Sequence, residues 1–187
     1  MKIPTTLFLL LLALGAKSQW LNADGYSLAY YGEFVSHPGL KGSLHYSLKE
    51  WNSSKDSQRQ RNISLSPSLG FFYHANYQSS FFVDAELAYQ RSKKRHAWEW
   101  GLIGGYQRSF IPNSWRILHN GIVEQHYPSY GALRSGLFVK YQRRIYQNEE
   151  HQVNLYIKPS TLAAWTGYPS NTGYFFLEIG LNLKHKA

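Results

Sequence analysis

Residues 63–73 read ISLSPSLGFFY and alternate apolar residues with small or polar ones at almost every step. Successive side chains of a β-strand point to opposite faces, so this pattern gives the segment one apolar and one small or polar face. The same period of two recurs in residues 81–90, 153–160 and 174–184, and helical periodicity is almost absent. The sequence therefore predicts an all-β chain.

Alternation fits both a soluble sandwich and a membrane barrel, and three features favour the barrel. The predicted strands are about 10–14 residues long, beyond the ~5–6 typical of soluble sheets and near the ~9–11 of tilted membrane strands. Their apolar faces end in aromatic residues, as in interfacial girdles: Tyr73, Tyr89, Trp98, Tyr106, Tyr141, Tyr146 and Trp165. Their polar faces carry charges in mid-strand, which a soluble core disfavours. We predict an up-and-down antiparallel transmembrane β-barrel with a filled polar interior.

Eight spanning strands are predicted, at residues 25–36, 40–51, 62–74, 80–91, 96–109, 131–146, 151–165 and 172–184. Segment 113–126 contains Asn120-Gly121, a strong two-residue hairpin signal, and is interpreted as a short hairpin projecting from a long loop, 110–130. Both chain ends then lie on one side of the membrane, together with a polar loop at 52–61. In the alternative count, 113–126 is a strand and 25–36 is a periplasmic segment.

The chain has 187 residues with 20 Lys+Arg, 11 Asp+Glu and no Cys, which predicts one domain and excludes disulfide scaffolds and thiol enzymes. Residues 1–18 have the features of a secretory signal peptide: Lys2, an apolar run at 7–14, and Ala16-Lys17-Ser18 as a cleavage site. We expect cleavage to leave residues 19–187 as a single barrel domain.

With its signal peptide, absence of Cys and eight amphipathic strands, the chain resembles the small outer-membrane β-barrel proteins of Gram-negative bacteria. The segment Tyr31-Gly-Glu33…His37-Pro-Gly-Leu-Lys41 is similar to uncharacterised barrel proteins of the Bacteroidetes. The resemblance implies residence in the outer membrane among lipid and lipopolysaccharide, and it implies no assigned activity.

An eight-stranded barrel has room only for side chains, so we expect no solute pore. Bulky inward residues are predicted at Phe72, Phe82, Phe138, Tyr156 and Phe176. The inward charges are interpreted as an interior salt-bridge network, because an unpaired buried charge is strongly destabilising. Its predicted members are Glu33, Lys49, Asp84, Glu86, Glu99, Arg134, Lys140, Arg144, Lys158 and Glu178.

One catalytic hypothesis rests on His45-Tyr46-Ser47, because alternate residues of a strand share a face and His45 could activate Ser47 as a nucleophile. The tripeptide is similar to the His-x-Ser pair of outer-membrane lipid A deacylases, with Glu86 as the candidate acidic partner. Those enzymes continue with Asn, whereas Leu48 follows here. We favour an ordinary histidine in the barrel lumen. Asp84 and Glu86 also share a face, and salt bridges are the favoured interpretation of that pair.

The eight His show no metal-ligand spacing, so neither a metal nor another cofactor is predicted. Basic clusters at 91–95 and 143–144 are assigned to lipid phosphates, and no nucleic-acid partner is expected. We predict a non-enzymatic barrel with a structural or surface-interaction role. Loop 110–130 and the turn at His37–Lys41 are its candidate recognition surfaces, with Trp115, Tyr127 and Tyr130 exposed for contact. The alternatives are a lipid-modifying enzyme and a subunit of a larger envelope complex.

Overall fold

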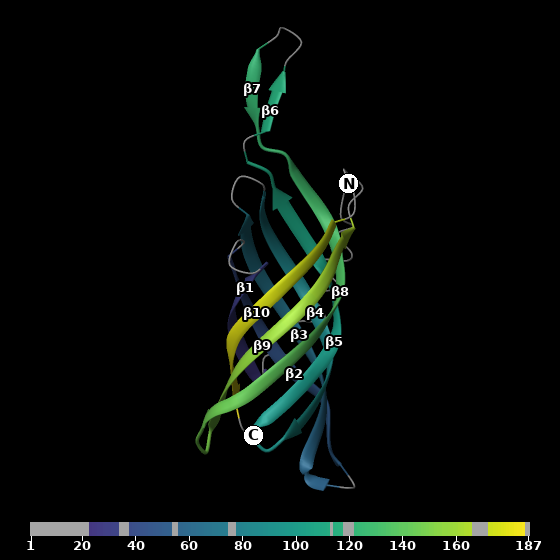
Figure 1. The fold of residues 1–187 in the computed structure, drawn as a ribbon, viewed down its shortest axis with the longest axis vertical. Coiled ribbons are helices and arrows are strands. Elements are labelled where there is room, and N and C mark those ends of the chain that lie inside the picture. Colours follow the sequence, from purple (N-terminus) through teal and green to yellow (C-terminus); the bar gives the residue numbers. More distant parts are fainter. Residues whose placement is uncertain are drawn as a thin grey trace, which may run out of the picture.

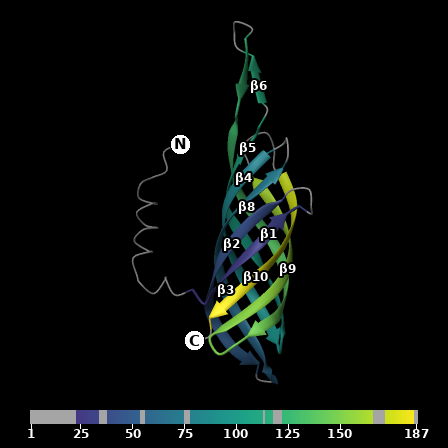
Figure 2. The same ribbon diagram turned by 90° about the vertical axis from the view of Figure 1, so that its left-hand side faces the viewer.

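A computed structural model of the chain describes residues 23–33, 38–53, 56–74, 78–112, 114–117, 122–165 and 172–185. Eight strands close into an antiparallel barrel in the order β1-β10-β9-β8-β5-β4-β3-β2 (Figures 1 and 2). They are β1 (Gly25–Gly32), β2 (Gly39–Ser53), β3 (Asp56–His74), β4 (Gln78–Lys93), β5 (His96–Phe110), β8 (Ser129–Gln147), β9 (His151–Trp165) and β10 (Thr172–His185). The described part of the chain contains no helix long and apolar enough to cross a membrane.

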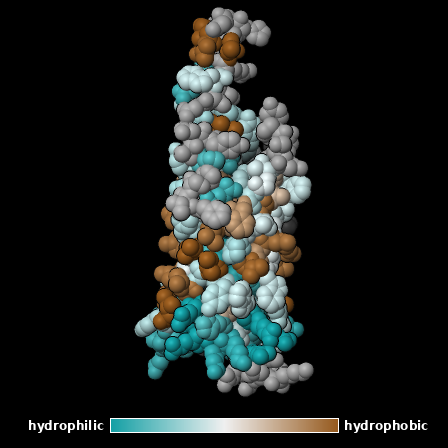
Figure 3. All heavy atoms as spheres, in the orientation of Figure 1, coloured by the Kyte–Doolittle hydropathy of each residue, from teal (hydrophilic) through white to brown (hydrophobic). Residues whose placement is uncertain are grey.

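The strand register places the apolar face of each strand beside the apolar face of its neighbour, and the polar face beside the polar face. In β3 and β4, Leu65 lies opposite Leu87 and Ser66 opposite Glu86, so the apolar and polar faces of the two strands coincide. The even-numbered residues of β4 from Gln78 to Gln90 are buried inside, and most of its odd-numbered residues are exposed outside. The barrel is therefore apolar outside and polar inside, as the sequence predicts, and Figure 3 shows apolar residues around its middle.

All eight predicted spanning strands are present, and β9 has the predicted bounds. The predicted polar loop at 52–61 is wrong, because β2 and β3 continue through it and still pair at Ser53 and Asp56. Backbone pairing between the two strands holds this extension together. It forms a narrow ribbon beyond the lower end of the barrel, where there is no barrel interior to fill, so its residues can be polar (Figure 1). β1 has shorter bounds than predicted, and residues 34–36 lie outside the described residues.

The segment between β5 and β8 forms the predicted hairpin. β6 (Ser114–Ile117) and β7 (Val123–His126) pair as a separate two-stranded sheet, while β1 takes its place in the barrel. The alternative strand count is therefore wrong. The hairpin projects beyond one end of the barrel, and Gly25 pairs with Lys184 at the opposite end (Figure 1). The Asn120-Gly121 turn and the predicted signal peptide lie outside the described residues.

Candidate functional site

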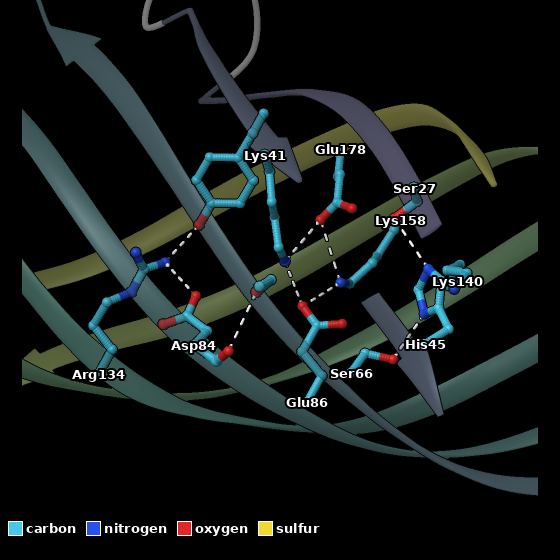
Figure 4. A network of polar contacts seen from close by, with 12 residues as sticks. Ser27, Lys41, His45, Ser66, Asp84, Glu86, Arg134, Lys140, Lys158 and Glu178 are labelled. Carbon is cyan, nitrogen blue, oxygen red and sulfur yellow. Dashed lines mark hydrogen bonds and ion pairs between the residues drawn. The ribbon is translucent and has the colours of Figure 1, made fainter. Parts of the chain in front are cut away.

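Four charged side chains from four strands meet inside the barrel, and we call them the central quartet: Lys41 (β2), Glu86 (β4), Lys158 (β9) and Glu178 (β10). The Lys158 Nζ lies 2.6 Å from Glu86 Oε1 and 3.2 Å from Glu178 Oε2. The Lys41 Nζ contacts the same two oxygens, and its distance to Glu178 Oε2 is also 3.2 Å (Figure 4). Two ammonium groups and two carboxylates thus form a neutral, alternating ring.

The quartet is sealed from solvent and supported by a further hydrogen bond. Its side chains are only 1–4% exposed. The Tyr156 hydroxyl donates to Glu178 Oε1 at 2.6 Å, so both oxygens of that carboxylate are engaged. Charges buried to this degree are stable only when they are paired and hydrogen-bonded, and the ring meets both conditions.

Two further ion pairs flank the quartet. Arg134 Nη2 lies 3.5 Å from Asp84 Oδ2, and the same nitrogen donates to the Tyr31 hydroxyl at 2.6 Å. Lys140 and Glu99 occupy opposed positions on β8 and β5, and their charged groups are 2.9 Å apart. The three groups of charges together involve six different strands of the barrel wall, so they connect the wall across its interior.

Aromatic side chains fill the interior toward the end that carries the hairpin. Phe176, which is fully buried, stacks on Tyr31 with ring centroids 4.3 Å apart and meets Phe72 edge-on at 5.2 Å. The Arg134 guanidinium lies 4.1 Å from the centre of the Phe82 ring, which joins the aromatic layer to the charged one. The interior is therefore occupied by packed side chains, and the geometry favours a plug over a channel.

The predicted interior network is placed only in part. The structure forms ion pairs with seven predicted members: Asp84, Glu86, Glu99, Arg134, Lys140, Lys158 and Glu178. Lys49 is exposed and lies 5.9 Å over the Trp51 ring, so its placement in the interior is wrong. A register shift between Ser47 and Lys49 adds one residue to β2 and reverses the faces beyond it. Glu33 is half-buried beyond the end of β1.

Lys41, Arg144 and Tyr130 lie in other places than the sequence predicts. Lys41 is expected in a recognition turn, but it lies in β2 and is only 2% exposed. Lys41 and Ser43 are alternate residues of one strand and so share a face, and this alternation is the sequence signal that places Lys41 inside the barrel. Arg144 lies at the end of the barrel away from the hairpin and hydrogen-bonds Gln147 and the Lys94 carbonyl. Tyr130 is half-buried at the start of β8 and is not fully exposed as expected, because the loop ends before it. His37 lies outside the described residues.

The proposed catalytic residues do not form a reactive group. His45 is hydrogen-bonded through Nδ1 to Ser66 at 2.8 Å and through Nε2 to Ser27 at 3.0 Å (Figure 4). Ser47 Oγ instead donates to Glu50 at 3.0 Å and accepts from Asn62 at 2.9 Å. Glu86 is held by the two lysines of the quartet. A nucleophile needs its base within hydrogen-bond reach, and here both nitrogens of the base are occupied elsewhere.

No group of three or more His, Cys, Asp or Glu among the described residues is placed to hold a metal ion. Cation sites in proteins need convergent carboxylates or imidazoles, and the interior carboxylates here converge on ammonium groups instead.

No family model and no curated protein matches this chain. Its structure is similar to the crystal structure of the N-terminal β-barrel domain of Pseudomonas aeruginosa OprF, with a TM-score of 0.45 and 12% sequence identity, covering 86% of this chain and 97% of that chain. The resemblance to Bacteroidetes barrel proteins stays a prediction.

Proposed function

We propose that this protein is a plugged, non-enzymatic β-barrel of the outer membrane, embedded among lipid and lipopolysaccharide, with a structural and surface-interaction role. The observation that carries the proposal is the apolar exterior. Large aliphatic side chains are exposed on strands all around the barrel, with Leu69, Val83 and Leu133 each about two-thirds exposed. Soluble monomers rarely leave such a continuous apolar surface in water.

The interior supports a structural role over transport. The central quartet and the aromatic layer occupy the lumen, and opening a path would separate buried ion pairs at a cost of several kcal/mol. Planar bilayers containing the purified protein should show no stable channel. A reproducible open conductance would contradict the plug.

The β6–β7 hairpin supports a surface-interaction role. Trp115 and Ile117 are 65% and 74% exposed, and Ile117 lies opposite Val123, so these apolar side chains share one face. A two-stranded hairpin is marginally stable alone in water, and covering this face would stabilise it. The proposal therefore places the contact with a partner here, outside the membrane.

Membrane fractionation tests the location. The protein should remain in the outer-membrane fraction, need detergent for extraction, and migrate differently on a gel before and after boiling. Recovery as a monomer from buffer without detergent would defeat the proposal. Native mass spectrometry in detergent then separates a monomer from a subunit of a larger envelope complex.

A further inference from the structure

A wide polar cavity opens at the barrel end opposite the hairpin, and we call it the vestibule. Its volume is about 770 Å³, and its lining includes residues near both chain ends, such as Asp24 and Lys184. Figure 3 shows hydrophilic residues gathered at this end of the molecule. Volumes of about 300–1,000 Å³ are usual for sites that take small molecules.

The vestibule carries a local excess of positive charge. Five cationic side chains line it, Arg61, Lys94, Arg95, Arg144 and Lys184, against the two carboxylates Asp24 and Glu50, which leaves a net charge of +3. Within the described residues, no ion pair involves any of the five cations. Each of these cations therefore lacks a described carboxylate within ion-pair distance.

The two carboxylates of the vestibule are engaged by neutral donors on the wall. Asp24 Oδ2 accepts from the backbone N–H of Ser47. Glu50 Oε1 accepts from the Ser47 hydroxyl at 3.0 Å and from Asn62 Nδ2 at 3.1 Å. The wall thus holds its acids by hydrogen bonds from neutral groups, and among the described residues Arg144 likewise donates only to neutral acceptors, Gln147 and the Lys94 carbonyl, so neither acid is paired with a cation.

A buried donor without an acceptor lies beside these cations. Asn154 lines the vestibule and is 3% exposed; its Oδ1 accepts from Gln152 Nε2 at 2.8 Å, while its Nδ2 has no partner. Asn154 is paired with Arg144 on β8 and with Asn182 on β10, two residues from Lys184. An unsatisfied buried donor is destabilising, and an acceptor that reached it would remove that cost.

The vestibule ends inside the barrel. A cavity of about 20 Å³, room for about one water, shares Asp24, Asn62 and Lys184 with the vestibule and is bounded by Glu99 and Lys140. The Lys140–Glu99 ion pair lines this inner cavity, which has no room for a molecule larger than water.

From this geometry we propose that the vestibule is a binding site for a small multivalent oxyanion, carrying phosphate or carboxylate groups. Arg144, Asn154 and Lys184 stand on three consecutive strands, β8, β9 and β10, and present a guanidinium, an amide donor and an ammonium. Charge-assisted hydrogen bonds of this kind are the strong ones in anion recognition. The site goes beyond the proposed structural role and does not depend on what the hairpin contacts.

Isothermal titration calorimetry on the detergent-solubilised full chain tests the site, with pyrophosphate and citrate as anionic probes and maltose as a neutral one. We expect saturable binding of at least one anion, weakened by added salt, and none of maltose. The preferred anion identifies the phosphate or the carboxylate as the recognised group. Absence of binding by both anions at low salt overturns the proposal.

Lys184→Gln is the first variant, because Lys184 forms no ion pair with a described residue and its removal leaves no buried carboxylate unpaired. The loss of one charge-assisted contact should weaken anion binding by about tenfold or more. Arg91→Gln removes an exposed cation of β4 that does not line the vestibule and should leave the affinity unchanged. Equal affinity in all three proteins, or equal weakening by both substitutions, overturns the assignment. Unchanged migration of unboiled protein on a gel verifies that each variant is folded.

Discussion

Glu86→Gln is the most direct perturbation of the barrel interior. Glu86 Oε1 contacts both lysines of the quartet, Lys41 and Lys158, and the side chain is 4% exposed. The amide has nearly the shape of the carboxylate but no charge, so the quartet changes from neutral to a net charge of +1. Removing one partner from a buried ion pair typically costs about 3–5 kcal/mol, because the remaining charge is left uncompensated. We expect the free energy of unfolding to fall by about that amount.

A second substitution tests the cause of this loss. Lys158→Met in the Glu86→Gln background removes one positive charge and leaves Lys41 paired with Glu178 at 3.2 Å. If charge balance is what matters, the double variant should be more stable than the sum of the two single losses predicts, with a coupling of about 1–3 kcal/mol.

Urea unfolding of the protein in lipid vesicles, followed by Trp fluorescence and by gel migration without boiling, measures these free energies. Glu124→Gln, on the exposed hairpin, is the matched control and should change stability by less than about 0.5 kcal/mol. A loss of less than about 1 kcal/mol in Glu86→Gln, or strict additivity in the double variant, would refute the reasoning that the quartet is an interdependent ring.

Further substitutions test the packing and the hydrogen bonds of single residues. Phe176→Ala should lower the free energy of unfolding by about 3–5 kcal/mol in the same urea assay, because this fully buried ring is central to the aromatic layer; a stability equal to that of the unmodified protein would disprove that role. Gly105→Ala should be destabilising because a Cβ there would clash with the Val83 carbonyl oxygen, whereas the adjacent Gly104→Ala meets nothing within 4 Å and should be neutral; equal unfolding midpoints for the two variants would contradict this. Ser47→Ala should leave the lipid A profile unchanged by mass spectrometry, since His45 is bound to other serines; an altered profile would restore the enzymatic alternative.

The spanning strands could be predicted from the sequence because the barrel constrains every residue. Each side chain either faces the packed interior or the exterior, so alternation is required along the whole strand, as in β4 with its buried Asp84 and Glu86 and its exposed Val83 and Leu87. The hairpin at 113–126 was predicted for a different reason, from Asn120-Gly121, a turn that lies outside the described residues; the pairing of β6 with β7 confirms the hairpin itself.

The sequence does not predict equally well which charged side chains pair with one another inside the barrel. Lys41 and Glu178 are 137 residues apart in sequence and meet only because β10 closes the barrel against β1, beside β2. The position of Lys49 depends on a single extra residue in β2, and one such bulge exchanges inward and outward faces for the rest of the strand. Alternation identifies the residues of a face, whereas the bulge position and the circumferential order decide which of them touch.

The interior is divided along the barrel axis into layers with different consequences for function. Aromatic rings fill the end near the hairpin, paired charges fill the middle, and an open cavity lined by cations that form no ion pair with a described residue occupies the other end. In the middle layer, the charges of the central quartet are held by one another in a closed ring, so these groups are unsuited to bind a solute or to transfer a proton. The hairpin face with Ile117 and the vestibule with Lys184 differ from this layer, because Ile117 is exposed and Lys184 forms no ion pair with a described residue. Recognition by this barrel is therefore expected at its two ends, through apolar contact at one and through charge at the other.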